Sequence, residues 1–379
     1  MRKAIIERQV RAIAEHKLDA MVSCSPENYA YATGFVVPSQ PLIRHRHAMA
    51  IVTADGRTEL FSVDMEASTV KRRAPEVPTR IWAEFTEDAM VELADQLDKL
   101  GLARARIGIE MDYLPAGDLA RLQKALPGAK FEHCEQILAR LRQIKTPEEI
   151  ALLRRLSRIA DQAITDALAS VRAGDSEMDI AGHLTRNVYA LGAEHFKLMI
   201  IATGERSVLP NVGPSERRLK PRDVCRVEIF SVIDGYQAGV CRTAVVHEAP
   251  PKAEAIWQHL VDCKYRIMEM VKPGASCLAI YEAFITKLAE MDLPPISFVG
   301  HGIGLHLHED PYLGKTPVLG RPGTDALIEE GMVLGFEPLC YETGHGFGMQ
   351  NKDMLLVTAS GCELLSDYAD TDKLLVVRG

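Results

Sequence analysis

The sequence predicts an α/β (α+β) protein with two domains, residues 1–143 and 144–379. A chain of 379 residues is longer than one ordinary hydrophobic core needs, which favours two domains. Helical and strand patterns alternate through about residue 140, as in an α/β domain with a mixed sheet. A strong helix start at Thr146 then begins the second domain.

The first domain opens with a charged amphipathic helix at residues 2–17, whose apolar residues recur on one face. A further helix is predicted at residues 87–100. Short apolar runs predict strands at residues 20–23, 48–52, 58–61 and 106–109.

The second domain begins with a capped helix. Thr146 can serve as the N-cap, Pro147 suits the first turn, and Glu149 stands where it completes a capping box. The helix is expected to continue through about residue 171.

The second domain also contains a short internal repeat: the segment at residues 171–176 recurs in similar form at 271–276. Its glycine can adopt a positive φ, and its serine can cap the next helix. Each copy leads through a helix to an apolar strand and a glycine-bearing loop, at residues 199–204 and 296–302. Either an αβ unit is duplicated, or common turn chemistry has produced the repeat by chance.

The composition is that of a soluble globular protein, with 47% hydrophobic and 25% charged residues. A net charge of −8 argues against nucleic-acid or anionic-membrane partners, since phosphate surfaces need clustered Lys and Arg. No apolar run approaches the roughly 18–20 residues of a membrane span, and the charged N-terminus is unlike a signal peptide. The eight scattered cysteines predict reduced thiols and a cytoplasmic protein, without a disulfide framework or zinc site.

Three motifs lie in the second domain, at residues 226–243, 300–311 and 331–338. Together they resemble the catalytic half of the prolidase, aminopeptidase P, methionine aminopeptidase and creatinase family. The resemblance implies a creatinase-like domain at residues 1–143. For residues 144–379 it implies a pita-bread catalytic domain with an internal pseudo-twofold repeat.

In the metallopeptidases of that family, two Asp, one His and two Glu hold two divalent ions. The corresponding positions here are Glu228, Gly239, His301, Glu337 and Lys352. A glycine offers no side-chain ligand and an ammonium repels a cation, so no metal and no other cofactor is expected.

The surviving charges suggest how the site can fold. Glu228 and Glu337 are balanced if Lys352 is charged and His301 is protonated, and unpaired buried charges are costly. We therefore expect the Lys352 ammonium near the former metal position, paired with both glutamates. An inert structural ion-pair cluster is the alternative reading.

The resemblance to creatinase and ectoine hydrolase, which need no metal, suggests catalytic roles. His308 is the expected proton carrier, with His301 as the other imidazole nearby. Asn211 stands where creatinase has its basic histidine, and an amide can orient a substrate but cannot act as a base. Cys241 is either an activated thiolate or a small apolar filler on a buried strand.

Substrate contacts are also implied by the resemblance. Arg46 aligns approximately with an arginine that grips the substrate carboxylate from the partner subunit of creatinase, although Arg44 competes for this role. Tyr236 and Tyr312 are expected to line the pocket. Family members of this length are commonly homodimers, so a homodimer with the active site near the subunit interface is expected.

The expected function is therefore a metal-independent hydrolase that cleaves a C–N bond of a small, carboxylate-bearing, amino-acid-like compound. In this reading Glu228 and Glu337 stabilise a developing cation or position water. Two other readings remain open: a non-catalytic small-molecule-binding protein, and an Xaa-Pro dipeptidase or aminopeptidase with an atypical metal site. A lyase that breaks a C–S or C–O bond is a further alternative.

Overall fold

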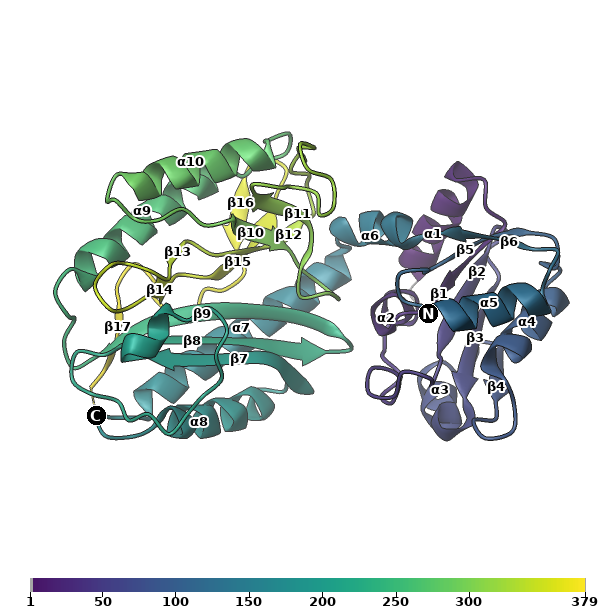
Figure 1. The fold of residues 1–379 in the computed structure, drawn as a ribbon, viewed down its shortest axis with the longest axis horizontal. Helices are drawn as coiled ribbons and strands as arrows, with labels where there is room; N and C mark the ends of the chain where they lie inside the picture. Colours follow the sequence, from purple (N-terminus) through teal and green to yellow (C-terminus); the bar gives the residue numbers. More distant parts are fainter. Residues whose placement is uncertain (1–2, 379) are drawn as a thin grey trace. The chain divides into compact units, whose positions relative to one another are not determined.

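The computed structural model describes residues 3–378 and divides into two compact units, with the division between Arg142 and Gln143. The first unit contains one sheet and the second contains the remaining sheets (Figure 1). Each unit has its own hydrophobic core. The fold is mixed α/β, as the sequence predicts.

The first unit is built on one mixed sheet of six strands, in the order β4-β3-β2-β1-β5-β6. Strand β1 pairs antiparallel with β2 and parallel with β5. The strands are β1 (Ala20–Ser23), β2 (Met49–Thr53), β3 (Thr58–Val63), β4 (Thr79–Trp82), β5 (Arg106–Ile109) and β6 (Lys130–His133). The helices are α1 (Lys3–Glu15), α2 (Pro26–Thr33), α3 (Ala67–Arg73), α4 (Ala89–Lys99), α5 (Ala116–Ala125) and α6 (Glu135–Gln143).

The side chains of β1 point alternately to the two faces of the sheet, and both faces are buried. Val22 packs in the core cluster that contains Leu93 of α4, whereas its neighbour Met21 packs with Ile13 of α1 and Leu138 of α6. This follows from the two-residue period of a strand, which sends successive side chains to opposite faces. The four strands and both helices expected here are present, although Arg2, the first residue of the expected 2–17 helix, lies outside the described residues.

The second unit begins with α7 (Pro147–Ala169), and its capping box is confirmed. The Thr146 hydroxyl accepts from the Glu149 N–H at 3.3 Å, and the Glu149 carboxylate accepts from the Thr146 N–H at 2.8 Å. The hydroxyl of Tyr236 also donates to this carboxylate, at 2.6 Å. Glu149 therefore ties the helix start to the strand at Tyr236.

Two sheets face each other in this unit, with helices on their outer sides (Figure 1). The four-stranded sheet has the order β17-β9-β8-β7 and the five-stranded sheet the order β11-β10-β12-β15-β16. The helices are α8 (Glu177–Ala190), α9 (Ala253–Met270) and α10 (Cys277–Ala289). The strands are β7 (His195–Thr203), β8 (Val224–Ile233), β9 (Tyr236–Val246), β10 (Phe298–Gly302), β11 (Glu309–Gly314), β12 (Val333–Phe336), β13 (Leu339–Cys340), β14 (Met349–Gln350), β15 (Asp353–Val357), β16 (Cys362–Leu364) and β17 (Leu375–Val377).

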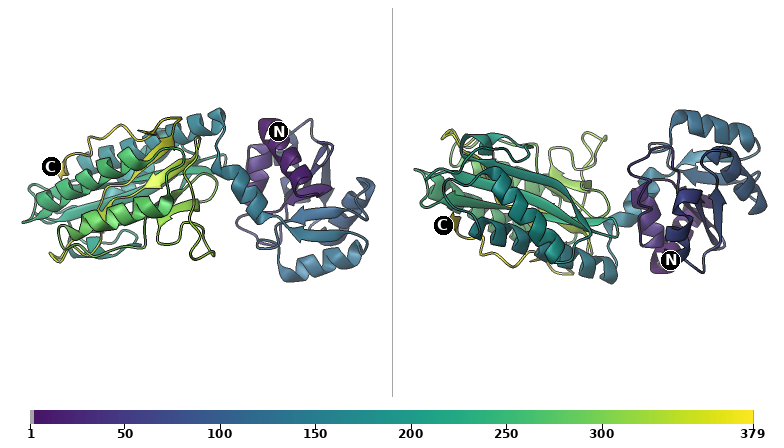
Figure 2. Two further views of the ribbon diagram at one scale, coloured as in Figure 1. Left: turned by 90° about the horizontal axis from the view of Figure 1, so that it is seen from above. Right: turned by 90° about the horizontal axis from the view of Figure 1, so that it is seen from below.

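The two halves of this unit repeat one arrangement, a helix pair covering a sheet. Figure 2 shows α9 and α10 side by side over one sheet and α7 with α8 over the other. Gly174 and Gly274 both have positive φ, and Ser176 and Ser276 cap α8 and α10 through their hydroxyls. The repeat in the sequence therefore marks a duplicated structural unit.

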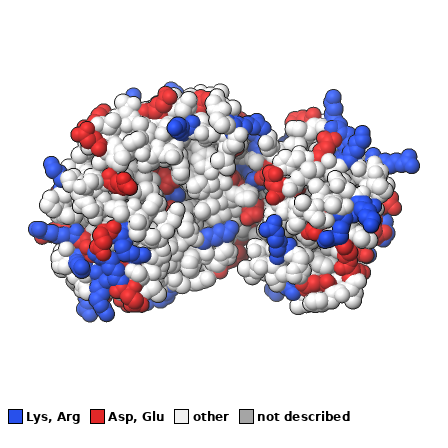
Figure 3. Space-filling view, in the orientation of Figure 1, with Lys and Arg blue, Asp and Glu red and all other residues white. Residues whose placement is uncertain are grey.

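The distribution of charge, the helices and the cysteines show no specialised feature in the described residues. Acidic and basic side chains lie intermixed over much of the face in Figure 3. No helix among residues 3–378 combines the length and apolar character needed to cross a bilayer. All eight cysteines are free, and seven of them are buried.

Candidate active site

The candidate site lies where the two sheets of the second unit meet. Glu228 is in β8, His301 is in β10, Glu337 directly follows β12, and Lys352 directly precedes β15. The sheets are joined here by a hydrogen bond from the Cys241 N–H on β9 to the Lys352 carbonyl, at 3.2 Å. Residues as far apart in the sequence as Glu228 and Lys352, 124 positions, thereby bring their side chains together.

Lys352 forms the centre of this cluster. Its Nζ lies 3.0 Å from Glu228 Oε1 and 3.4 Å from Glu337 Oε2, so the expected ion pairs are present. The ammonium also lies 4.7 Å from the centroid of the Phe230 ring, a cation–π distance. Burial opposes its charge, but the two glutamates prevail and raise the pKa of Lys352 to about 12. Lys352 is therefore a buried, permanently charged ammonium.

Glu337 is held by further contacts. Gln350 donates to Glu337 Oε2 at 2.7 Å, and Gln350 also accepts from Arg226 at 3.2 Å. Burial raises the pKa of the Glu337 carboxyl, whereas Lys352 opposes this rise. The other oxygen, Oε1, has no hydrogen-bond partner among the described residues.

His301 presents a lone pair to that free oxygen. Its Nδ1 lies 2.8 Å from the Gly302 carbonyl, which requires the proton on Nδ1 in the neutral ring. Its Nε2 lies 3.5 Å from Glu337 Oε1 and also has no hydrogen-bond partner in residues 3–378. Burial, and then Lys352, lower the pKa of His301 well below its ordinary value. The expectation of a protonated His301 is therefore wrong, because a buried imidazolium beside an ammonium is unfavourable.

His308 stacks on His301, with ring centroids 3.8 Å apart and planes 11° apart. The hydroxyl of Tyr312 lies 3.3 Å from His308 Nδ1, and Phe298 contacts both rings edge-on. Partial burial and the nearby Lys352 lower the pKa of His308 to about 4, although part of its side chain is exposed. His308 is thus a neutral base at pH 7, and Tyr312 lies beside it.

Cys241 pairs directly with Glu228 across β8 and β9 and is fully buried. Burial, and then the Glu228 charge, raise the pKa of its thiol. The activated-thiolate reading is therefore not supported, and Cys241 fills space beside the cluster as a small neutral side chain.

The other expected substrate contacts lie elsewhere. The Tyr236 hydroxyl donates to Glu149 at the start of α7, so the expectation that it lines the pocket is wrong. Asn211 is exposed on a loop whose preceding carbonyls, at Leu209 and Pro210, accept from the Arg226 guanidinium. This arginine ties the loop to β8, two residues from Glu228.

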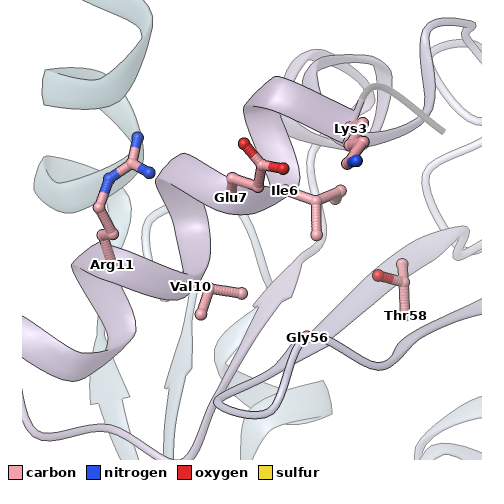
Figure 4. Close-up of a pocket in the computed structure, with 7 residues that line it drawn as sticks. All are labelled: Lys3, Ile6, Glu7, Val10, Arg11, Gly56 and Thr58. Carbon is pink, nitrogen blue, oxygen red and sulfur yellow. The ribbon is translucent and has the colours of Figure 1, made fainter.

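The two arginines proposed for a carboxylate lie in the first unit. Arg46 donates to Glu84 at 2.8 Å, so its guanidinium already has a carboxylate partner, and Arg44 is exposed. A groove of about 590 Å³ also lies in this unit, between α1 and the turn before β3 (Figure 4). Its lining residues are Lys3, Ile6, Glu7, Val10, Arg11, Gly56 and Thr58, none of which belongs to the cluster.

Sequence reasoning did not single out Arg226, Phe230 and Gln350. The first two alternate with Glu228 along β8, and the two-residue period of a strand places all three on one face. That signal was available in the sequence. The position of Gln350 depends on how β14 approaches β9, which no local pattern shows.

The residues do not fit the two-ion set of the family's metallopeptidases. A Cβ added at Gly239 would lie 2.5 Å from the Phe230 ring and 2.6 Å from the Ile229 carbonyl, so a ligand side chain has no room there. The Lys352 ammonium occupies the other substituted position. Within residues 3–378 no group of three or more His, Cys, Asp and Glu side chains is placed to hold a metal ion.

Family models match both units. A model described as metallopeptidase family M24 matches residues 151–359, and one described as the creatinase/prolidase N-terminal domain matches residues 6–144. An Xaa-Pro dipeptidase of Pyrococcus furiosus is 26% identical over 96% of this chain and 98% of its own length. A putative dipeptidase of Bacillus subtilis is 28% identical over 72% of this chain and 74% of its own.

Solved structures show the same fold. The Xaa-Pro dipeptidase from Bacillus anthracis superposes with a TM-score of 0.84 at 24% identity and covers 99% of both chains. The prolidase from Pyrococcus horikoshii gives a TM-score of 0.81 at 23% identity, over 97% of this chain and 99% of its own.

These relatives contradict the expected function, a metal-independent hydrolase of the creatinase type. The Pyrococcus furiosus relative is named an Xaa-Pro dipeptidase and matches along nearly the whole chain. The expectation was based on the substituted ligand positions. These positions bear on ion binding, but they do not determine which residues line the substrate pocket. Because the M24 match covers more than half of the sequence and the N-terminal match covers most of the remainder, this chain belongs to metallopeptidase family M24, with an N-terminal domain of the creatinase/prolidase type.

Proposed function

We propose that this chain is a hydrolase that cleaves the peptide C–N bond of short Xaa-Pro peptides, at the cluster around Lys352. The observation that carries the proposal is the similarity to an Xaa-Pro dipeptidase across 96% of the chain. The cluster supports it, since its charged residues stand at the catalytic positions of that family.

The two unpartnered acceptors favour a substrate with a free amino group. His301 Nε2 and Glu337 Oε1 are both buried acceptors, 3.5 Å apart, and a donor group lying beside both atoms would satisfy them. The ammonium at the N-terminus of a dipeptide can donate to both. Water can fill the same position when no peptide is bound.

His308 is the proposed base for the attacking water. It is neutral at pH 7, and when Nδ1–H donates to the Tyr312 oxygen, Nε2 carries the free lone pair. His308 takes one proton from water as the hydroxide adds to the peptide carbonyl carbon. The same proton then passes to the departing nitrogen as the C–N bond breaks.

Peptide binding without turnover is the second candidate. The observation that favours it is Lys352, whose two ion pairs already satisfy the acids that would otherwise hold the catalytic ions. Calorimetry with Ala-Pro, followed by chromatography of the same mixture, separates the two candidates. Binding with intact peptide supports the second, and release of free proline supports the first.

The test of the proposed activity uses a panel of Xaa-Pro dipeptides, with Ala-Ala as the comparison. Protein as purified, protein with a chelator, and protein with added Mn²⁺ or Co²⁺ are compared by chromatography. The proposal predicts release of proline from at least one Xaa-Pro peptide, and loss of that release in His308→Asn. No hydrolysis under any of the ion conditions would refute it.

We also propose that the protein is cytoplasmic and forms a homodimer. The eight free cysteines support a reducing compartment. The dimer rests on the family resemblance alone, and light scattering of the purified chain tests it. A mass near 41.9 kDa, that of one chain, would contradict the dimer.

A further inference from the structure

A phenylalanine ring fills the position beside Gly239. Phe230 and Gly239 are direct partners across β8 and β9, and the Phe230 side chain is fully buried. The ring is so close to Gly239 that any Cβ there would overlap it, at 2.5 Å. Glycine is thus the residue that lets the ring lie flat against β9.

The same ring contacts Lys352. The ammonium has carboxylates at 3.0 Å and 3.4 Å and the ring centroid at 4.7 Å. A charge buried this deeply is stable only when it is surrounded by favourable partners. Glu228, Glu337 and the face of Phe230 supply them.

Gly239 and Lys352, the two altered ligand positions, and the Phe230 ring between them therefore depend on one another. Gly239 makes room for Phe230, Phe230 covers one side of Lys352, and Lys352 neutralises the two glutamates. Replacing Gly239 alone with aspartate would force the new side chain into the ring. Replacing Lys352 alone would remove the ammonium but leave the ring in the space of a missing ligand.

We infer that Phe230, Gly239 and Lys352 form one packed unit that excludes a pair of divalent ions, and that all three must change before such a pair can bind. This inference concerns ion binding alone. It goes beyond the proposed peptide hydrolysis, whose success or failure is measured separately, by proline release.

The test measures Mn²⁺ binding by calorimetry and by metal analysis after gel filtration. Four proteins are compared: wild type, Lys352→Glu, Gly239→Asp/Lys352→Glu, and the triple variant that adds Phe230→Gly. Exposed Lys99→Glu is the matched control for the change of charge. Circular dichroism checks that each variant is folded.

The expected result is about two tightly bound ions per chain in the triple variant alone. Wild type, the control and the two lesser variants should retain less than one ion per chain after gel filtration. Two ions retained by wild type, by Lys352→Glu or by Gly239→Asp/Lys352→Glu would overturn the inference. So would a folded triple variant that binds none, and if the triple variant fails to fold, the wild-type and Lys352→Glu measurements still decide.

Discussion

At the scale of single residues, the unusual feature is a buried ammonium between two carboxylates. Lys352 is only 2% exposed, and both of its acidic partners are buried with it. Breaking such a group by removing one member leaves an uncompensated charge, which typically costs about 3–5 kcal/mol. The cluster should therefore contribute to folding as well as to function.

Lys352→Met is expected to destabilise the protein by about 3 kcal/mol or more at pH 7, because both glutamates lose their counter-ion. Urea unfolding measures the loss. Lys99→Met, which removes an exposed lysine paired with Asp95, should change stability little. Equal losses in the two variants would show that the buried ion pairs contribute no more to the free energy of unfolding than an exposed pair does.

The same variant should become less stable as pH rises. Burial already raises the pKa of Glu337 above 4.5, and loss of Lys352 removes the opposing effect. A carboxyl with a raised folded pKa binds more protons in the folded than in the unfolded state, so stability falls as pH rises from about 4.5 through the folded value. Unfolding of Lys352→Met at pH 5 and pH 8 measures this. A larger loss at pH 5 would contradict it.

His308 should set the acidic limb of activity. Because its pKa is lowered to about 4, the base stays neutral and kcat/KM should hold down to about pH 5, then fall. The pH profile of Ala-Pro hydrolysis measures this. His308→Asn should lose most of the activity, while His306→Asn, two residues away, should retain it. An acidic limb near pH 6.5 would argue against His308 as the base.

Motif matching predicted some contacts of individual residues and missed others. Matching positions predicted the pairing of Lys352 with both glutamates, because ligand positions converge on one point in this fold. It failed for Tyr236, whose hydroxyl donates to Glu149. The motif match also missed Phe230, although the two-residue period of β8 places this ring on the same face as Glu228.

At the scale of elements, local rules predicted most of what has a strong local cause. Strands at residues 20–23 and 106–109 and the capped helix after Thr146 have clear periodicity or caps, and all are present. Helix α2 was missed because nearly all its residues are buried, so it shows no amphipathic face. Strand β6 was missed because three of its four residues are polar and both ends are exposed, so its position depends on pairing with β5 and on packing of Phe131 against the core.

The start of α7 provides a test at this scale. Thr146→Ala should cost about 1 kcal/mol, the usual effect of losing an N-cap, and Ser276→Ala at α10 should cost a similar amount. Glu149→Ala should cost more than either, because it also removes the acceptor of the buried Tyr236 hydroxyl. Urea unfolding compares the three. A Glu149 variant no weaker than Thr146→Ala would show that the Tyr236 contact contributes nothing.

At the scale of the whole molecule, the sequence predicted the class of fold and the family, and both are shown. The repeated αβ unit places one sheet from each half against the other, and the cluster forms where they meet. The reaction could not be predicted in the same way. The two altered ligand positions, Gly239 and Lys352, predicted a reaction without metal. Substrate choice depends on the loops around the cluster, which those two positions do not describe.

The Lys352 ammonium lies between Glu228 and Glu337, where the metallopeptidases of the family hold ions. Anomalous diffraction from crystals soaked in Mn²⁺ tests this placement of the ammonium. We expect no anomalous peak beside these carboxylates, with Lys352 Nζ within about 3.5 Å of each. Two peaks bridged by the glutamates, with Lys352 displaced, would contradict it.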